Sequence, residues 1–144
     1  MSRYISVALQ ALVRSRFSNC CSYCQTDERL TAMRCEFEHI VPRSLGGETI
    51  FQNLCLACSC CNRLKGGRVE FVDPVSEEMV PVFHSQQQIW TKHFGWEQDG
   101  AIVVGKTAIG RATVAAFQMN REALVSMREM WVIFGKHPPE GSLK

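Results

Sequence analysis

Two cysteine pairs, Cys21-Ser-Tyr-Cys24 and Cys58-Ser-Cys-Cys61, have the residue type and the spacing of a metal site. Each pair is a Cys-x-x-Cys knuckle, and four thiolates from two knuckles satisfy the tetrahedral preference of zinc, with bonds of about 2.3 Å. We therefore expect these four residues to hold a structural Zn²⁺. The register stays open, because Cys55-Leu-Ala-Cys58 is also a Cys-x-x-Cys and Cys20 can replace Cys21.

All eight cysteines lie between positions 20 and 61. A disulfide framework is typical of secreted chains, and the N-terminus lacks the apolar segment and cleavage site of a secretion signal. A redox pair is disfavoured because no βαβ pattern surrounds either knuckle. We expect the four cysteines outside the knuckles to be small buried side chains, namely Cys20, Cys35, Cys55 and Cys60.

His39 is the only histidine between the two knuckles, and its residue type suits the hydrolysis of a phosphodiester. An imidazole with an ordinary pKa of about 6.5 can accept the proton of an attacking water at neutral pH. A hard divalent cation can neutralise the phosphate. Strand alternation sends the neighbours Glu38 and His39 to opposite faces, except at a bulge or a strand end.

Several motifs follow one another around this histidine: Glu38-His39-Ile-Val-Pro42, Gly46-Gly47, Asn53-Leu54 and Cys61-Asn62-x-x-Lys65. Their order resembles the HNH endonuclease family over about residues 17–68. The tail resembles a common bacterial type of this family, through Trp90-x-x-His93-Phe94-x-Trp96, Gly110-Arg-Ala-Thr-Val114, Asn120-Arg121 and Gly135-x-His137-Pro-Pro139.

The resemblance implies a ββα-metal finger that hydrolyses DNA to 3′-hydroxyl and 5′-phosphate ends, with RNA as the second choice of substrate. It implies His39 as the general base and Asn53 as the residue that orients its ring. It also implies Glu38 and Asn62 as ligands of a catalytic Mg²⁺ or Mn²⁺, although the family more often has aspartate before the histidine. The alternatives are a solvated strand residue for Glu38, a helix-start residue for Asn62 and a turn residue for Asn53.

Basic residues are concentrated in the first half of the chain. Residues 1–68 hold nine Lys/Arg and five Asp/Glu, whereas residues 69–144 hold seven and nine. This balance is compatible with a nucleic-acid partner without requiring one. The candidates for phosphate contact, each with solvated surface charge as the alternative, are Arg43, Arg63, Lys65 and Arg68.

The sequence predicts an α+β fold: a small ββα finger stapled by the four-cysteine site, with flanking helices and a mixed C-terminal extension. Apolar spacing predicts a helix over 6–17 capped by Ser6, and a polar turn at 25–29 between two strands. The second of these strands lies within 34–41 and ends at Pro42. A loop then runs to about residue 53, and a short helix runs from about 59 to 65.

In the second half we expect strands at 80–83 and 101–104 and helices at 86–94 and 108–118. A last helix follows an N-cap at Asn120, with one face formed by Leu124, Met127, Trp131 and Phe134. The length of 144 residues suits a single domain, with a nuclease core at about 17–68 and an extension at about 69–144.

Composition argues against several other classes of protein. No stretch approaches the roughly 18 apolar residues of a membrane span, and no low-complexity tract is present. We expect a cytoplasmic monomer without a small-molecule cofactor. Beside a metal-dependent endonuclease, two hypotheses remain: a zinc-stabilised nucleic-acid-binding module without catalysis, and a cysteine-based redox sensor. His39→Ala would abolish the function of the nuclease and spare that of the binding module.

Overall fold

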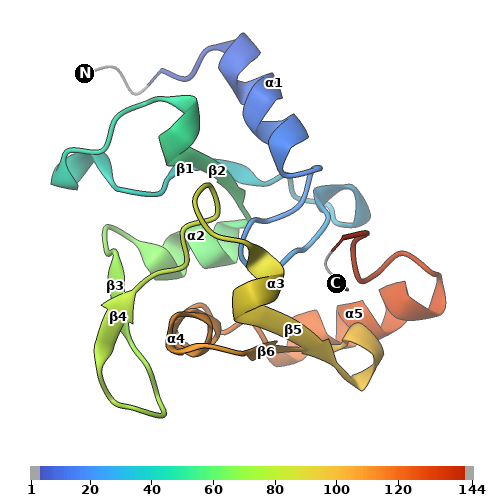
Figure 1. The fold of residues 1–144 in the computed structure, drawn as a ribbon. Coiled ribbons are helices and arrows are strands. Elements are labelled where there is room, and N and C mark those ends of the chain that lie inside the picture. Colours follow the sequence, from blue (N-terminus) through green and yellow to red (C-terminus); the bar gives the residue numbers. More distant parts are fainter. Residues whose placement is uncertain (1–3, 142–144) are drawn as a thin grey trace. The chain divides into compact units, whose positions relative to one another are not determined.

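The computed structural model describes residues 4–141, and the chain divides into two compact units (Figure 1). The first unit comprises the chain up to Val69 together with 84–87, and the second comprises 70–83 and the chain from Gln88 onward. The division does not decide whether the chain is a single domain, so that expectation stays a prediction. Each unit is described by itself.

The first unit begins with helix α1 (Val7–Arg16), because Ser6 caps it: the Leu9 amide donates to the Ser6 hydroxyl at 3.1 Å. Strands β1 (Glu36–His39) and β2 (Leu54–Ala57) form an antiparallel pair in which His39 lies opposite Leu54. All four residues of β2 are buried. The hairpin therefore forms the centre of this unit, with His39 at the end of β1.

Short turns and a helix complete the first unit. Three 3₁₀ turns occupy η1 (Glu28–Leu30), η2 (Arg43–Leu45) and η3 (Phe51–Asn53). Helix α2 (Ser59–Lys65) follows β2 and packs on both strands of the hairpin. It ends at Gly66, whose φ of +57° is a conformation that glycine adopts without strain.

In its described part, up to residue 141, the second unit contains two further hairpins and three helices. Strand β3 (Glu70–Val72) pairs with β4 (Met79–Pro81), and β5 (Phe94–Glu97) pairs with β6 (Ile102–Gly105). Helix α3 (Trp90–His93) precedes β5, and the 3₁₀ turn η4 (Gln98–Gly100) joins β5 to β6. Helices α4 (Ala108–Ala116) and α5 (Glu122–Ile133) follow. A Cβ atom at Gly110 would overlap the His93 carbonyl, so α4 approaches this backbone more closely than a larger residue allows.

The predicted α+β class is confirmed, as are the helices expected at 6–17, 59–65 and 108–118. The helix expected at 86–94 is reduced to α3, and the strand expected before the polar turn is a single bridge between Cys20 and Asp27. Strand β2 was not predicted, because a segment buried on both faces shows no alternation of apolar and polar residues.

The start and the face of α5 also differ from expectation. Arg121 occupies the N-cap position, and the Asn120 side chain instead bonds both backbone groups of Val103. Leu124 and Trp131 are buried, whereas Met127 is 40% and Phe134 72% exposed. Only part of the predicted apolar face of α5 is therefore buried in the core.

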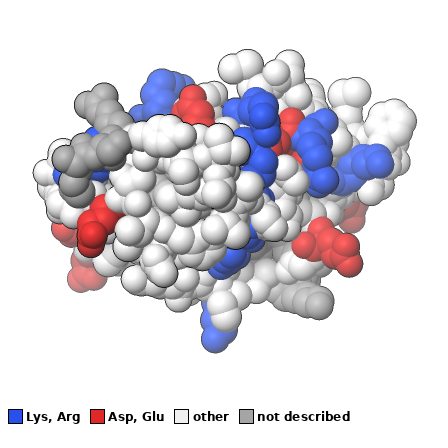
Figure 2. Space-filling model, turned by 90° about the horizontal axis from the view of Figure 1, so that it is seen from above, with Lys and Arg blue, Asp and Glu red and all other residues white. Residues whose placement is uncertain are grey.

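Two surface properties bear on possible partners. Among the described residues, no helix is long and apolar enough to cross a bilayer. Figure 2 shows several Lys and Arg side chains close together on one side of the face seen from above, with a few acidic side chains among them. Such a surface is compatible with a polyanionic partner.

Candidate metal and catalytic site

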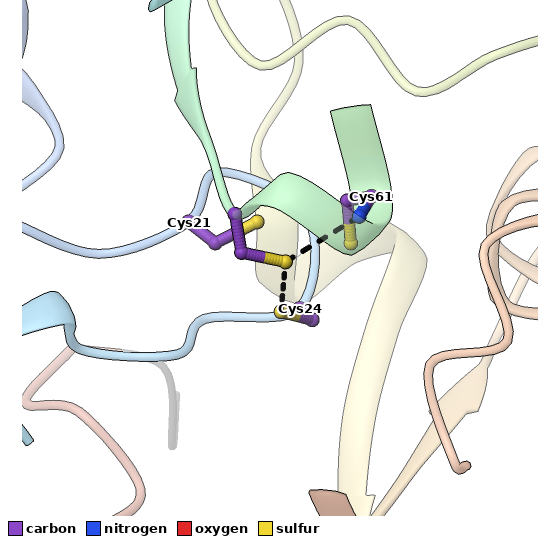
Figure 3. Close-up of side chains that lie close together, drawn as sticks. Cys21, Cys24 and Cys61 are labelled. Carbon is purple, nitrogen blue, oxygen red and sulfur yellow. Dashed lines mark hydrogen bonds between the residues drawn. The ribbon is translucent and has the colours of Figure 1, made fainter. Parts of the chain in front are cut away.

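The four predicted zinc ligands converge in the first unit. Figure 3 shows three of them, Cys21, Cys24 and Cys61, close together. The Sγ atoms of Cys21, Cys24, Cys58 and Cys61 all lie within 4.8 Å of one another, and those of Cys24 and Cys58 are 3.7 Å apart. Tetrahedral Zn–S bonds of about 2.3 Å place two sulfurs about 3.8 Å apart. Cys21, Cys24, Cys58 and Cys61 are therefore placed to hold a metal ion, and their geometry fits zinc.

Local backbone structure forms each knuckle. In the first, the Cys21 amide donates to the Thr26 carbonyl at 2.9 Å, and Gln25 turns the chain back with a φ of +65°. In the second, Cys58 is the N-cap of α2, and its sulfur accepts the Cys61 amide at 3.4 Å. Four thiolates close a tetrahedral site and leave no open position for water, so an ion held here is structural.

The other cysteines lie outside this cluster. Cys20, Cys35 and Cys55 are buried, and burial raises the pKa of the Cys20 thiol to about 12, with the Asp27 charge adding to the effect. These groups stay protonated at neutral pH. Cys60 is only half-buried at the start of α2, where an Arg63 N–H donates to its sulfur at 3.9 Å. The expectation of burial is therefore wrong for Cys60.

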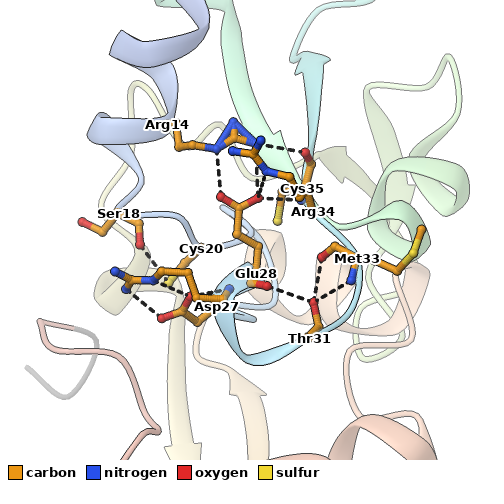
Figure 4. Close-up of polar contacts among 10 residues, drawn as sticks. Arg14, Ser18, Cys20, Asp27, Glu28, Thr31, Met33, Arg34 and Cys35 are labelled. Atoms are coloured by element: carbon orange, nitrogen blue, oxygen red, sulfur yellow. Dashed lines mark hydrogen bonds and ion pairs between the residues drawn. The ribbon is translucent and has the colours of Figure 1, made fainter.

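A buried carboxylate ties α1 to the segment that enters β1 (Figure 4). Arg14 donates to the two Glu28 oxygens at 2.8 and 3.2 Å, and the Cys35 amide donates to the same carboxylate at 2.8 Å. Glu28 is 6% exposed. Glu28 therefore connects α1 with Cys35, the residue directly before β1.

His39 is half-buried at the end of β1, with its Nε2 atom 2.9 Å from the Thr49 hydroxyl. Burial lowers the pKa of the His39 imidazole, and the positive charge of Arg43 lowers it further. The ring is therefore neutral at neutral pH, which is the state that a general base requires. Sequence reasoning missed Thr49, since nothing in the spacing of the motifs singles it out.

Asn53 holds the backbone that follows His39. Its side-chain oxygen accepts the Val41 amide at 2.9 Å, and its nitrogen donates to the carbonyls of Val41 and Glu48 at 3.0 and 2.9 Å. Both amide hydrogens are thereby used. Asn53 thus fixes the strand end, while Thr49 contacts the ring, which differs from the expected bond between Asn53 and His39.

Gly47 is required by the close approach of the loop to this strand end. A Cβ atom there would overlap the Val41 carbonyl oxygen and lie 2.9 Å from the Asn53 side chain. The preceding Gly46 has a φ of +88°, the left-handed region that glycine favours. The Gly-Gly pair therefore lets the loop return close to the residues after His39.

Glu38 points away from His39 and into a buried polar cluster. Its Oε1 atom lies 2.7 Å from the ammonium group of Lys65, and its Oε2 atom accepts the Tyr23 hydroxyl at 2.8 Å. Lys65 is fully buried, and Glu38 is 5% exposed. Lys65 was expected to contact phosphates, but its ammonium group is buried and is not accessible to a phosphate group.

Asn62 lies against the beginning of β1. Its side chain donates to the Glu36 carboxylate at 2.7 Å, and this contact is exposed to solvent. The expected ligands Glu38 and Asn62 are thus held by different partners. Among residues 4–141, the four cysteines are the group of His, Cys, Asp or Glu that converges closely enough to hold an ion. The arrangement around Glu38 does not fit the expected catalytic ion, and the assignment of these two ligands stays a prediction.

The segment from Cys21 to Arg68 matches a known family, HNH endonuclease. We refer to residues 21–68, which are similar to this family, as the HNH segment. The match begins at the first zinc ligand and ends just after α2, so it includes the cysteine cluster, His39 and the hairpin. It confirms the resemblance seen in the sequence and indicates a nuclease-type function. No curated protein and no solved structure matches the chain.

The three arginines expected to contact phosphates take different positions. Arg43 lies in η2, half-buried beside His39. Arg63 and Arg68 are exposed on and after α2, and Arg68 also donates to the Leu64 carbonyl at 2.9 Å. The two exposed guanidinium groups are accessible to an anionic partner, in contrast to Lys65.

Proposed function

We propose that the protein is a metal-dependent endonuclease that hydrolyses phosphodiester bonds of DNA, with His39 as the general base. The observation that carries this proposal is a half-buried imidazole that contacts Thr49 at the end of β1, within the HNH segment. DNA is favoured over RNA only by the family resemblance. The exposed guanidinium groups of Arg63 and Arg68 support an anionic partner.

The contact between His39 and Thr49 sets the direction of proton transfer in this proposal. A hydrogen on Nε2 that is donated to the Thr49 hydroxyl leaves the lone pair on Nδ1. Nδ1 then accepts the proton of the attacking water, while Thr49 keeps the ring in this orientation. Asn53 and Gly47 act through the backbone, because they fix the strand end that carries the ring.

We further propose that cleavage depends on Mg²⁺ or Mn²⁺, which would neutralise the phosphate and the leaving oxygen. No catalytic step is assigned to this ion, because Glu38 is engaged with Lys65 and Asn62 with Glu36. The zinc ion proposed for the four cysteines has a separate, structural role.

The test is cleavage of supercoiled plasmid by the full chain with Mg²⁺, Mn²⁺ or EDTA. We expect the wild type to nick or linearise the plasmid only with added metal. His39→Ala should keep its zinc and its folding and lose at least about a hundredfold in rate. His93→Ala, the same substitution outside the HNH segment, is the matched control. Equal rates for His39→Ala and wild type would reject His39 as the base.

A second candidate function is a zinc-stabilised nucleic-acid-binding module without catalysis. The engagement of Glu38 by Lys65 favours it, because a carboxylate held by an ammonium group is not available to a catalytic cation. This hypothesis predicts that wild type and His39→Ala bind DNA equally and that neither cleaves it. Metal-dependent cleavage by the wild type would reject it.

A further inference from the structure

The backbone directly after His39 is held from two sides. On one side, the Ile40 amide donates to the Asn53 carbonyl at 2.8 Å, and the Asn53 side chain bonds both backbone groups of Val41. On the other side, the ammonium group of Lys65 donates to the carbonyls of Ile40 at 2.8 Å and His39 at 3.4 Å. The backbone that directs the His39 side chain is therefore fixed by contacts from two elements, η3 and α2.

Lys65 can serve this purpose only because Glu38 balances its charge. A fully buried ammonium group without a counter-ion is strongly unfavourable, and Glu38 lies 2.7 Å away. The other oxygen of the carboxylate accepts from Tyr23 at 2.8 Å and from Cys55 at 3.0 Å. The carboxylate is thus paired with Lys65 through Oε1 and hydrogen-bonded to Tyr23 and Cys55 through Oε2.

We propose that Glu38 is the counter-ion of Lys65 rather than a metal ligand, and that Lys65 is a positioning residue for His39. The proposal rests on the proposed function, because the effect of positioning is measured as cleavage. It assigns roles opposite to those expected from the sequence, in which Glu38 binds the ion and Lys65 contacts phosphate.

The expected effect follows from the precision that proton transfer requires. A displacement of about 1 Å in a catalytic group can lower a rate a hundredfold. Loss of the ammonium group frees the carbonyls of His39 and Ile40 from α2, so that this backbone is held by Asn53 and by the pairing of β1 with β2 alone. The ring then samples directions from which it cannot reach the attacking water, whereas binding of DNA elsewhere is unaffected.

The experiment compares Glu38→Gln, Lys65→Met and the double variant in the full chain. Each single variant leaves one buried charge without its partner, so we expect a clear drop in melting temperature for both. The double variant removes both charges and should recover at least half of that drop. Lys92→Met, at an exposed lysine of the second unit, is the control for the substitution itself.

Binding of Mn²⁺, measured by calorimetry without DNA, separates the two roles of Glu38. As a counter-ion, Glu38 contributes nothing directly, so Glu38→Gln/Lys65→Met should bind Mn²⁺ with wild-type affinity. A metal-ligand role predicts weaker Mn²⁺ binding in every variant that carries Glu38→Gln, and no recovery of melting in the double variant. Either of these results would overturn the counter-ion assignment.

Cleavage kinetics and hydrogen exchange of the folded double variant test the positioning role. We expect kcat to fall at least about tenfold with KM within about twofold. We also expect faster exchange of the Ile40 and Val41 amides, while amides of α1 are unchanged. Wild-type kcat and wild-type exchange in this variant would overturn the role of Lys65. If the wild type itself does not cleave, the proposed function fails, and melting, Mn²⁺ binding and exchange still decide the inference.

Discussion

The cysteine cluster and the His39 end of the hairpin lie in the same unit, yet they are encoded in different ways. The four sulfurs converge to within 4.8 Å of one another from two short motifs whose spacing fixes their geometry. At His39, the side chains named by the sequence motif are instead engaged by residues far along the chain, as in the pair of Glu38 and Lys65. Local spacing therefore determines the geometry within each cysteine pair, whereas tertiary contacts bring the two pairs together and determine the partners of the motif residues around His39.

The strongest way to break this comparison is to remove one zinc ligand. Cys58→Ser should release zinc and unfold the first unit, because structural zinc contributes folding free energy of order 10 kcal/mol. Zinc content and circular dichroism measure the effect. Cys60→Ser, two residues further along, should retain the ion and the fold. A Cys58→Ser protein with unchanged zinc and melting would show that the cluster is not the metal site.

A smaller effect is expected at Asn53, and the chain offers a second asparagine with the same pattern of bonds as a control. Asn53 bonds both backbone groups of Val41, and Asn120 bonds both backbone groups of Val103. Each substitution by alanine should cost about 2–3 kcal/mol of unfolding free energy. Only Asn53→Ala should also lower the rate of plasmid cleavage, with zinc retained. Equal losses of cleavage in both variants would mean that the bonds between Asn53 and Val41 have no specific link to the site.

Thr49→Val tests the partner of the ring with little change in shape. Loss of the hydroxyl frees the ring orientation that the 2.9 Å contact sets, so kcat should fall roughly tenfold while stability changes little. Thr31→Val, which removes a hydroxyl from the loop before β1, serves as the control. A wild-type kcat for Thr49→Val would show that the ring does not depend on this contact.

The smallest expected effect concerns pH. Burial, together with the charge of Arg43, lowers the pKa of His39, so the neutral base persists to lower pH than in a free imidazole. The cleavage rate should fall with decreasing pH at a midpoint below about 6.5. Arg43→Gln removes a positive neighbour and should move this midpoint upward, as measured by a pH–rate profile. Arg63→Gln should leave the midpoint in place, and a shift of equal size there would contradict the local origin of the effect.

Several features could be predicted from the sequence because they are local. Ser6 caps α1, each Cys-x-x-Cys motif places two candidate metal ligands three residues apart, and Gly66 ends α2. The HNH segment itself could be recognised from the order of its motifs.

Other features depend on residues distant in sequence and could not be predicted. Glu38 and Lys65 are joined only when α2 folds back onto β1, and alternation along the strand does not say which partner meets a buried carboxylate. Thr49 contacts His39 through a loop whose path Gly47 permits. The motif thus identified the residues of the site better than it identified their partners.

The central claim, that His39 is the base of a nuclease whose zinc is only structural, is tested most directly in one protein sample. Zinc content and single-turnover cleavage of supercoiled plasmid are measured together for His39→Ala and the wild type. We predict equal zinc content and a loss in cleavage rate of at least about a hundredfold. Equal zinc content with an unchanged cleavage rate would contradict the account.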